Sequence, residues 1–397
     1  MILGYSKLKR LDFKTALFQY RKFYPFYSGY LDLANQKSTI KTTSNSEYDL
    51  NNHIYMVNDI PPYFKLIPNQ ENPTLAIIAL SQFDGFMANL TGFKNIEEYL
   101  NFQMGAKSRA KLRRYKRGLE TCFNVKYRFI YGSIDTEEYF FLFKRFKYLI
   151  ETRFKQRGAT HESLKNWATI EKETRSLILD KKASLFVIYD KDKPIDICLN
   201  YHYKNVFYNV IRSYDIDYSK FRLGSIDIFV QLDWCFANDH QIFDLGRGDL
   251  EYKRLWCNET YKFQQHLIYD KKLFTKKLNA NLIAKFIKGK DFLKKKNIHV
   301  VYRKIKSIFK KKEKRDTISR PEIRNDVSDF VIDPNHLIDI SLEQYAFLRK
   351  YTYDFQYSSF ETSENIKLYK SKKDSNTYLI QGKTKNQSIT LDSNAYK

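Results

Sequence analysis

The most constraining feature of this chain is the order of hydrophobic patterns between residues 135 and 250. Asp135 and Glu138 have capping-box spacing ahead of apolar residues at helical intervals, which predicts a helix that ends near Gly158. A second helical pattern follows, and then three strand-like runs joined by short polar turns. The predicted elements are helices at 135–157, 161–179 and 224–238 and strands at 184–189, 195–203, 206–212 and 242–245. This order predicts an α+β fold, with a mixed, mostly antiparallel sheet flanked by helices.

A charged Gly-x-Gly loop follows the last of these strands. The chain has only 13 glycines in 397 residues, yet Gly246 and Gly248 flank Arg247 directly behind an apolar run. Glycine permits a positive φ and lets a ligand approach the backbone closely. Two interpretations remain open on spacing alone: a tight turn with solvated charges, or the edge of an active site.

The sequence of this segment resembles a motif of a known family. It reads Phe243-Asp244-Leu245-Gly246-Arg247-Gly248 and then Tyr252-Lys253. This is similar to the last core motif of the GNAT-type acyltransferase domain in FemAB-like and CelD-like (cellulose biosynthesis-associated) proteins. Residues 108–117, which are rich in arginine and lysine, resemble the basic helix that these proteins carry ahead of that domain. The resemblance covers roughly residues 100–270.

The resemblance implies tandem GNAT-like acyltransferase domains. The first is expected at residues 1–125 and the second, the acyltransferase domain, at 126–272. A basic helical arm at 273–315 and a small α+β extension at 316–397 complete the predicted organisation. Disorder over part of that extension is one alternative, because its composition turns polar from Thr317.

Several protein classes are not indicated by the sequence. No apolar run approaches the roughly 18 residues that a membrane span needs, and the N-terminus has no apolar core of a secretory signal. The four cysteines are scattered and form no C-x-x-C pair, so neither a zinc site nor a disulfide framework is indicated, and no metal is expected. The sequence therefore predicts a cytoplasmic protein.

The positive charge is concentrated near one segment. The formal net charge is +24, and residues 271–315 hold 18 lysines and arginines against Asp291 and Glu313. This distribution describes a basic arm on an otherwise mildly basic protein. We expect the arm to meet a polyanion, with the anionic inner face of the membrane as the first choice and RNA as the second. A solvated helix with no partner is the remaining alternative.

The resemblance also implies that the donor is a thioester, acyl-CoA (acetyl-CoA), and implies where it would bind. Its pyrophosphate would lie on backbone N–H groups at the start of the helix after the third strand. Here that start reads Lys220-Phe221-Arg222-Leu223-Gly224-Ser225, so Lys220, Arg222, Gly224 and Ser225 are the expected donor-binding residues. The family turn is only partly present, which leaves a glycine at an ordinary helix N-terminus as the alternative.

The expected catalytic residues lie around the Gly-x-Gly loop. In many GNAT enzymes a tyrosine early in the helix after the last core strand protonates the departing thiolate, and Tyr252 stands at that place. Glu251, Asp244 and His202 are candidates for a base or for orienting the substrate, and a packed or solvated residue is the alternative for each. Arg247, Asp249 and Lys253 are the expected substrate-binding residues.

Three functions remain open. The first is an N-acyltransferase that acts on an amine or hydroxyl of a sugar, polysaccharide or cell-envelope precursor. The second is a catalytically weakened GNAT-fold binding protein. The third is a nucleic-acid-binding protein, which the confinement of charge to one arm disfavours. A FemAB-type transferase that takes an aminoacyl-tRNA donor would be an enzyme that also binds RNA, so nucleic acid is expected only as tRNA that carries the donor.

Overall fold

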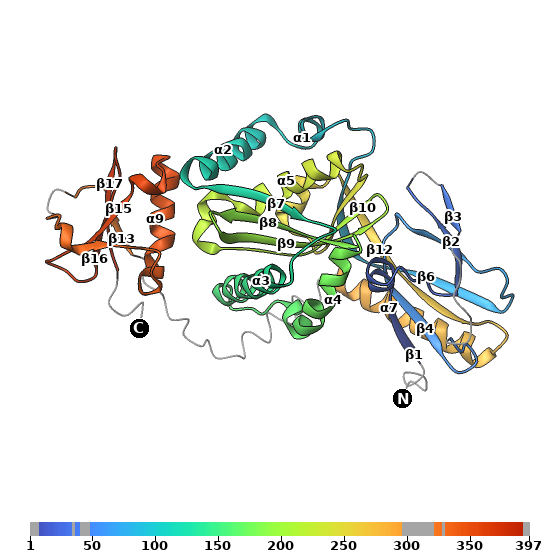
Figure 1. The fold of residues 1–397 in the computed structure, drawn as a ribbon. Coiled ribbons are helices and arrows are strands. Elements are labelled where there is room, and N and C mark those ends of the chain that lie inside the picture. Colours follow the sequence, from blue (N-terminus) through green and yellow to red (C-terminus); the bar gives the residue numbers. More distant parts are fainter. Residues whose placement is uncertain (1–7, 34–35, 40–47, 296–320, 328–329, 392–397) are drawn as a thin grey trace, which may run out of the picture. The chain divides into compact units, whose positions relative to one another are not determined.

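The computed structural model describes residues 8–33, 36–39, 48–295, 321–327 and 330–391. The chain divides into two compact units, each assembled from separate stretches of sequence (Figure 1). Unit 1 comprises residues 1–91, 201–208 and 241–313, and unit 2 comprises 92–200, 209–240 and 314–397. The predicted domains were contiguous, and their boundaries stay a prediction.

Unit 1 is built on a sheet with the strand order β1–β4–β12–β6–β11. β12 pairs antiparallel with both β4 and β6, and β1 pairs in parallel with β4. The long β6–β12 ladder forms the centre of this sheet. The strands are β1 (Leu8–Asp12), β4 (Ile54–Ile60), β6 (Leu75–Asn89), β11 (Ile242–Arg247) and β12 (Glu259–Asp270).

Smaller elements complete unit 1. A three-stranded antiparallel sheet has the order β3–β2–β5. Its strands and the helical elements of the unit are β2 (Tyr27–Leu31), β3 (Lys37–Thr39), β5 (Lys65–Pro68), η2 (Thr15–Gln19), α6 (Glu251–Trp256) and α7 (Phe274–Lys295). α7 lies in the segment predicted to be a basic helical arm, and its helical state is confirmed over these residues. The rest of that segment, 296–315, lies outside the described residues.

One face of α7 is part of the core of unit 1. Ala280, Ile283 and Ala284 are buried and pack with Leu267 of β12 and Met56 of β4. The helix is therefore docked on the sheet along its inner face, which the sequence pattern did not anticipate. The described residues contain no helix with both the length and the apolar character that a membrane crossing requires.

Unit 2 contains the three predicted helices and most of the first three predicted strands, whereas the fourth predicted strand, 242–245, is β11 of unit 1. The strands of unit 2 follow the order β10–β9–β8–β7, and helices lie on both sides of them (Figure 1). The elements up to residue 237 are α1 (Ile96–Gln103), α2 (Ala106–Cys122), β7 (Val125–Ile130), α3 (Thr136–Gln156), η4 (Glu162–Asn166), α4 (Trp167–Leu179), β8 (Ala183–Asp190), β9 (Lys193–Tyr203), β10 (Val206–Tyr214), η5 (Ile216–Phe221) and α5 (Leu223–Ala237). β9 and β10 each continue into unit 1 at residues 201–208.

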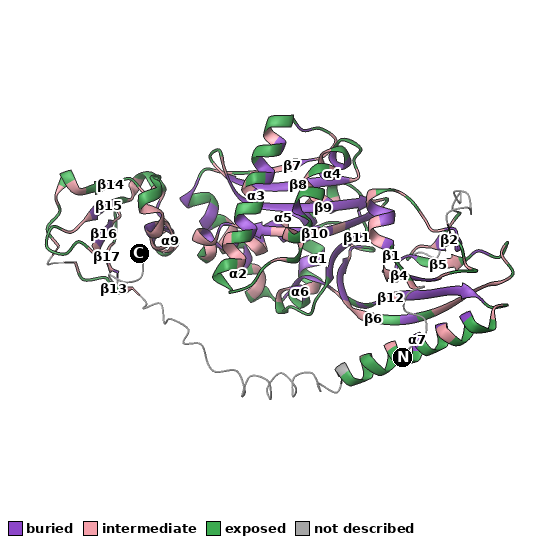
Figure 2. Ribbon diagram, turned by 90° about the horizontal axis from the view of Figure 1, so that it is seen from below, coloured by how far each residue is buried: buried purple, intermediate pink, exposed green. Residues whose placement is uncertain are grey.

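Local chemistry explains these elements. The Asp135 side chain accepts hydrogen bonds from the backbone N–H groups of Glu137 and Glu138, so the predicted cap of α3 is confirmed. β8 and β9 are joined through a two-residue connection in which Lys191 has a φ of 52°, as a tight hairpin requires. The apolar runs of β8 and β9 are almost continuously buried (Figure 2). The predicted α+β fold with a mostly antiparallel, helix-flanked sheet is therefore confirmed.

The C-terminal part of unit 2 is a small α+β module. A five-stranded sheet has the order β13–β17–β16–β15–β14, and its last three strands form an antiparallel meander, in keeping with the predicted small α+β extension. The elements are β13 (Glu322–Arg324), η6 (Pro334–His336), β14 (Leu337–Ile338), η7 (Glu343–Tyr345), α9 (Ala346–Ser359), η8 (Ser363–Asn365), β15 (Lys367–Lys370), β16 (Thr377–Gln381) and β17 (Asn386–Thr390). Tyr353 of α9 packs on Phe123 and Tyr218, with ring centroids 5.0 and 4.6 Å apart, so the module shares a core with the rest of unit 2.

Candidate functional site

The Gly-x-Gly loop connects β11 to α6 in unit 1. Gly246 has a φ of 68° and Gly248 a φ of 102°, and both values lie where L-residues are strained. A Cβ atom on Gly246 would stand 3.2 Å from the Tyr208 hydroxyl oxygen, whereas one on Gly248 would meet no atom within 4 Å. Both glycines are thus required by the backbone, and Gly246 also by a close neighbour.

Asp244 anchors the start of this loop. Its carboxylate is fully buried and accepts hydrogen bonds from the hydroxyls of Tyr63 and Tyr261, both at 2.6 Å. It also accepts the backbone N–H of Gly246 at 2.7 Å. Burial raises the pKa of Asp244 above its ordinary value, although these three hydrogen bonds oppose the shift. The geometry explains Asp244 as a support of the loop, and its role as a base stays a prediction.

Lys253 binds the loop from the other side. Its ammonium is buried and donates to the carbonyl oxygens of Leu245, Gly246 and Arg247 at 2.7, 3.2 and 2.6 Å. Three donors therefore hold three consecutive carbonyl groups, which gives a physical reason for a lysine in this motif. Its predicted contact with substrate remains untested.

The remaining loop residues point toward solvent to different degrees. Arg247, Asp249 and Glu251 are exposed and Tyr252 is half-buried. The Arg254 guanidinium donates to Asp249 at 2.8 Å from its Nε and lowers the pKa of that carboxyl. Arginine, tyrosine and carboxylate groups thus lie close in sequence on the loop and the first turn of α6, and buried contacts hold the loop in shape.

Sequence reasoning missed a lysine next to this loop. The Lys14 ammonium donates to the Tyr208 hydroxyl at 2.8 Å and lies 3.9 Å from the Asp59 carboxylate. It also stands over the rings of Tyr208 and Phe263, 4.7 and 4.9 Å from their centroids. Burial alone would lower the pKa of Lys14, but Tyr208 and Asp59 outweigh it and the pKa is raised. No local pattern marks a lysine between β1 and η2 as half-buried.

His202 lies in the same unit and is 2% exposed. Its ring packs edge-on against the ring of Phe207, with centroids 5.0 Å apart. This environment describes a packed histidine on a strand, and its proposed role as a base stays a prediction.

β10 and β11 are parallel neighbours over a short stretch only. Val206, Phe207 and Tyr208 pair with Ile242, Phe243 and Asp244. β11 also pairs antiparallel with β6, and the register shifts between Asp244 and Arg247. The pairing thus becomes irregular where the loop begins, and irregularities such as β-bulges are common beside active sites.

The expected donor-binding residues lie in unit 2, where η5 leads into α5. Lys220 and Arg222 are exposed, and Arg222 has a φ of 56° at the joint between the two elements. No side chain caps the first turn of α5, and that turn contains no acidic residue. Gly224 has little room, because a Cβ atom there would stand 3.1 Å from the Tyr214 ring. The Ser225 backbone N–H bonds to the Arg222 carbonyl oxygen at 2.7 Å.

Arg212 of β10 holds this joint in place. Its guanidinium donates to the carbonyl oxygen of Gly224 and to both oxygens of Asp227, with Nε 3.2 Å from Asp227 Oδ2. Asp227 is fully buried, and the Arg212 side chain is 14% exposed. The ion pair therefore ties the first turns of α5 to the sheet.

A second buried carboxylate lies beside this ion pair. Asp196, Cys198 and Asp227 offer an oxygen, a sulfur and an oxygen that all lie within 4.8 Å of one another. Burial and the neighbouring Asp227 raise the pKa of Asp196 well above its ordinary value. Because the Arg212 guanidinium already neutralises Asp227, the cluster is explained as an internal ion-pair network rather than as a metal site.

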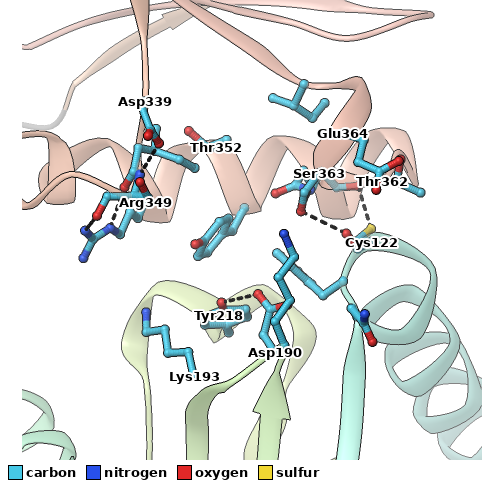
Figure 3. Close-up of a pocket in the computed structure, with 18 of the residues that line it drawn as sticks. Cys122, Asp190, Lys193, Tyr218, Asp339, Arg349, Thr352, Thr362, Ser363 and Glu364 are labelled. Carbon is cyan, nitrogen blue, oxygen red and sulfur yellow. Dashed lines mark hydrogen bonds between the residues drawn. The ribbon is translucent and has the colours of Figure 1, made fainter.

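A cavity of about 850 Å³ in unit 2 lies between α9 and the β8–β9 hairpin (Figure 3). The Tyr218 hydroxyl donates to Asp190 at 2.8 Å on its floor, and the Ser363 hydroxyl donates to the Cys122 carbonyl oxygen at 3.1 Å. Its charged lining residues are Asp190, Lys191, Asp192, Lys193, Asp339, Glu343, Arg349 and Glu364. Because Tyr218 belongs to η5, the C-terminal module packs against the element that directly precedes Arg222.

Comparison with known proteins gives one family match. Residues 106–254 match the family model of the acetyltransferase (GNAT) domain. No curated protein sequence matches the chain.

Several solved structures are weakly similar. FemX is 11% identical with a TM-score of 0.40, over 56% of this chain and 73% of its own. A conserved protein of unknown function from Bacteroides thetaiotaomicron is 8% identical with a TM-score of 0.36, over 55% and 70%. L-PGS from Bacillus licheniformis is 10% identical with a TM-score of 0.34, over 59% and 73%. TM-scores this low do not by themselves support a shared arrangement.

Proposed function

We propose that this acyltransferase, whose GNAT domain spans residues 106–254, moves an acyl group from acyl-CoA to an amine or hydroxyl of a sugar, polysaccharide or cell-envelope precursor. The observation that carries the proposal is the uncapped start of α5, where two exposed cations, Lys220 and Arg222, stand beside the first turn. A pyrophosphate needs backbone N–H donors and neighbouring positive charge, and a helix N-terminus supplies both.

The joint before α5 is suited to hold a large anion. Arg222 adopts a left-handed conformation, and Arg212 fixes the following carbonyl group and Asp227. Because these contacts are internal, the backbone of the first turn is set before a donor arrives. Acetyl-CoA is the donor that we propose for this site.

The proposed chemistry is transfer at the thioester carbonyl. The acceptor nitrogen or oxygen attacks the carbonyl carbon, the C–S bond breaks, and the thiolate of coenzyme A leaves. Tyr252 gives the thiolate a proton, and a base takes the proton that the acceptor loses. Glu251 is the most accessible of the three candidate bases, since Asp244 and His202 are buried.

The acceptor would be held by the exposed part of the Gly-x-Gly loop. Arg247 and Asp249 offer a donor and an acceptor of hydrogen bonds that suit a hydroxylated substrate. Lys253 would act through the shape of the loop, because its ammonium is bonded to three loop carbonyls. We place the reaction in the cytoplasm, at the inner face of the membrane, where lipid-linked precursors lie.

A second donor class is favoured by one observation. α2 presents exposed basic side chains at helical spacing, namely Lys107, Lys111, Arg114 and Arg117. Such a surface would suit the phosphate backbone of an aminoacyl-tRNA, which would make the protein a FemAB-type aminoacyl transferase. A binding protein without turnover is the third outcome, in keeping with the incomplete family turn at Gly224.

A donor screen by thermal shift distinguishes these outcomes. Acetyl-CoA, a longer acyl-CoA and an aminoacyl-tRNA would each be tested at rising concentration, and a ligand at 100 times its Kd should add about 2.7 kcal/mol to the stability. We expect acyl-CoA to stabilise the protein and Arg222→Ala to weaken that effect. Lys172→Ala on α4, another exposed cation of unit 2, is the matched control. Stabilisation by aminoacyl-tRNA alone would reject the acyl-CoA donor.

A further inference from the structure

α7 has an inner face that is fixed to unit 1. Ala280, Ile283 and Ala284 are at most 6% exposed and pack on the sheet, with Ile287 beside them. Lys276 is buried as well, and its ammonium donates to the Asn52 carbonyl oxygen at 2.7 Å. The orientation of the helix on the sheet is therefore determined.

The outer face of α7 carries large apolar side chains that the sheet does not cover. Their exposed fractions run from 47 to 75%, well above those of the inner face. The outer apolar residues are Phe274, Leu278, Leu282, Phe286, Phe292 and Leu293. The first four recur every fourth residue, which places them along one side of a helix. A contiguous apolar stripe of this kind on a protein surface marks a contact with another apolar phase.

Lysines border this stripe. Lys277, Lys285, Lys288 and Lys290 are exposed on the same helix. The sequence then continues with nine more lysines and arginines between residues 296 and 315, against Glu313 alone. An apolar stripe with lysines at its margins is the composition of a helix that lies in the plane of an anionic membrane surface.

We propose that the outer face of α7 is a docking surface for an anionic lipid membrane. The stripe from Phe274 to Leu293 enters the boundary between headgroups and acyl chains, and the bordering lysines meet lipid phosphates. The helix lies on the membrane rather than crossing it. This inference rests on the proposed location at the inner membrane face but not on the proposed chemistry.

The same face suits RNA less well. Stacking on bases could use the phenylalanines of the stripe, but it gives no role to the leucines, which make up the other half. Leucine side chains gain from an apolar phase but offer nothing to a base or a phosphate. An anionic membrane accounts for both residue types, because its acyl region takes up the leucines and its phosphates attract the lysines.

Vesicle co-sedimentation with the full chain tests the proposal. Phosphatidylcholine vesicles with and without about one-third phosphatidylglycerol would be compared at low and high salt, in the absence of donor and acceptor. We expect binding to the anionic vesicles that weakens at high salt. The double variant Leu278→Gln/Leu282→Gln should lower the partition coefficient about tenfold or more, because two half-exposed leucines no longer enter the bilayer. Lys285→Ser/Lys288→Ser should weaken binding mainly at low salt.

Leu337→Gln is the matched control, since Leu337 is 57% exposed on β14 of unit 2. It should bind like the unchanged protein, and circular dichroism would confirm that each variant is folded. The proposal fails if the unchanged protein ignores anionic vesicles at low salt, or if the double leucine variant binds as well as the control. Loss of binding on deletion of 296–315 with no effect of the leucine variant would assign the contact to that segment and overturn the role of α7. Binding of RNA by the unchanged protein, together with no binding to vesicles, would likewise overturn the proposal.

Discussion

Replacing Arg212 by methionine should strongly destabilise unit 2. The guanidinium neutralises Asp227 and also binds the Gly224 carbonyl oxygen, while Asp227 is fully buried. Methionine has a similar reach but no charge, so a buried carboxylate would lose its partner. Breaking one side of a buried ion pair costs about 3–5 kcal/mol, because the remaining charge stays desolvated. We expect Arg212→Met to lower the free energy of unfolding by that amount at pH 8.

The loss should shrink as the pH falls. Asp196 already has a raised pKa, caused first by burial and then by Asp227, and Arg212 opposes that shift. Without Arg212 the pKa of Asp196 should rise further. The folded state of the variant then binds protons more tightly than the unfolded state, so its stability increases as the pH drops through the folded pKa. The deficit at pH 5.5 should be smaller than that at pH 8.

Urea unfolding followed by tryptophan fluorescence would measure both effects, because Trp167 and Trp234 belong to unit 2. The double variant Arg212→Met/Asp227→Leu should recover much of the loss, since neither charge remains. A deficit below about 1 kcal/mol at pH 8, or a double variant less stable than the single one, would refute the assignment of this pair as the tie between β10 and α5.

Further outcomes are expected elsewhere in the molecule. Gly246→Ala should cost more stability than Gly248→Ala, because both strain the backbone but only the first meets a neighbouring atom; equal costs by urea unfolding would contradict the contact. Tyr252→Phe should lower kcat by about 10²-fold or more with little change in donor binding, because only the proton donor is removed; unchanged turnover would remove this tyrosine from the mechanism. Burial lowers the pKa of His266 to about 4, so on acidification the folded state binds the proton at a lower pH than the unfolded state does. The free energy of unfolding should therefore fall by about 3 kcal/mol between pH 7 and pH 4. His266→Gln should flatten that part of the pH profile of stability, and an identical profile would count against the buried neutral ring. Tyr353→Ala should destabilise unit 2 by about 3 kcal/mol through lost aromatic packing. A loss of stability below about 0.5 kcal/mol would show that the C-terminal module does not share the core of unit 2.

Sequence reasoning succeeded where the signal was local. The cap at Asp135 and the turns between β8, β9 and β10 each depend on residues a few positions apart, so spacing is enough to predict them. The Gly-x-Gly loop was also found from spacing, because its two positive φ angles restrict the residue type.

The partners that support the loop could not be predicted. Tyr63 reaches Asp244 across 181 residues of sequence, and Lys14 reaches Tyr208 across 194. Neither contact leaves a periodic trace in the chain, since a lone tyrosine or lysine looks the same whether it is buried or solvated. Only the assembled sheet of unit 1 brings these side chains to one place.

α7 shows a different limit. Its lysines and apolar residues predicted a basic helical arm, and the helix is confirmed, but the pattern did not indicate that one face of it packs on the sheet. The helix carries apolar residues on two sides, with Ile283 on the packed face and Leu282 on the exposed face. Adjacent apolar positions give no single helical period, so the sequence could not tell which side would be covered.

The most direct test of the central claim is acyl transfer itself. Purified protein would be mixed with acetyl-CoA and an amino sugar such as glucosamine, with the release of free thiol measured and the acceptor analysed by mass spectrometry. The account predicts thiol release that depends on the acceptor, together with an acetylated product, and both should fall in Tyr252→Phe. No acceptor-dependent release across amine and hydroxyl acceptors, with aminoacyl-tRNA consumed instead, would contradict the acyl-CoA mechanism.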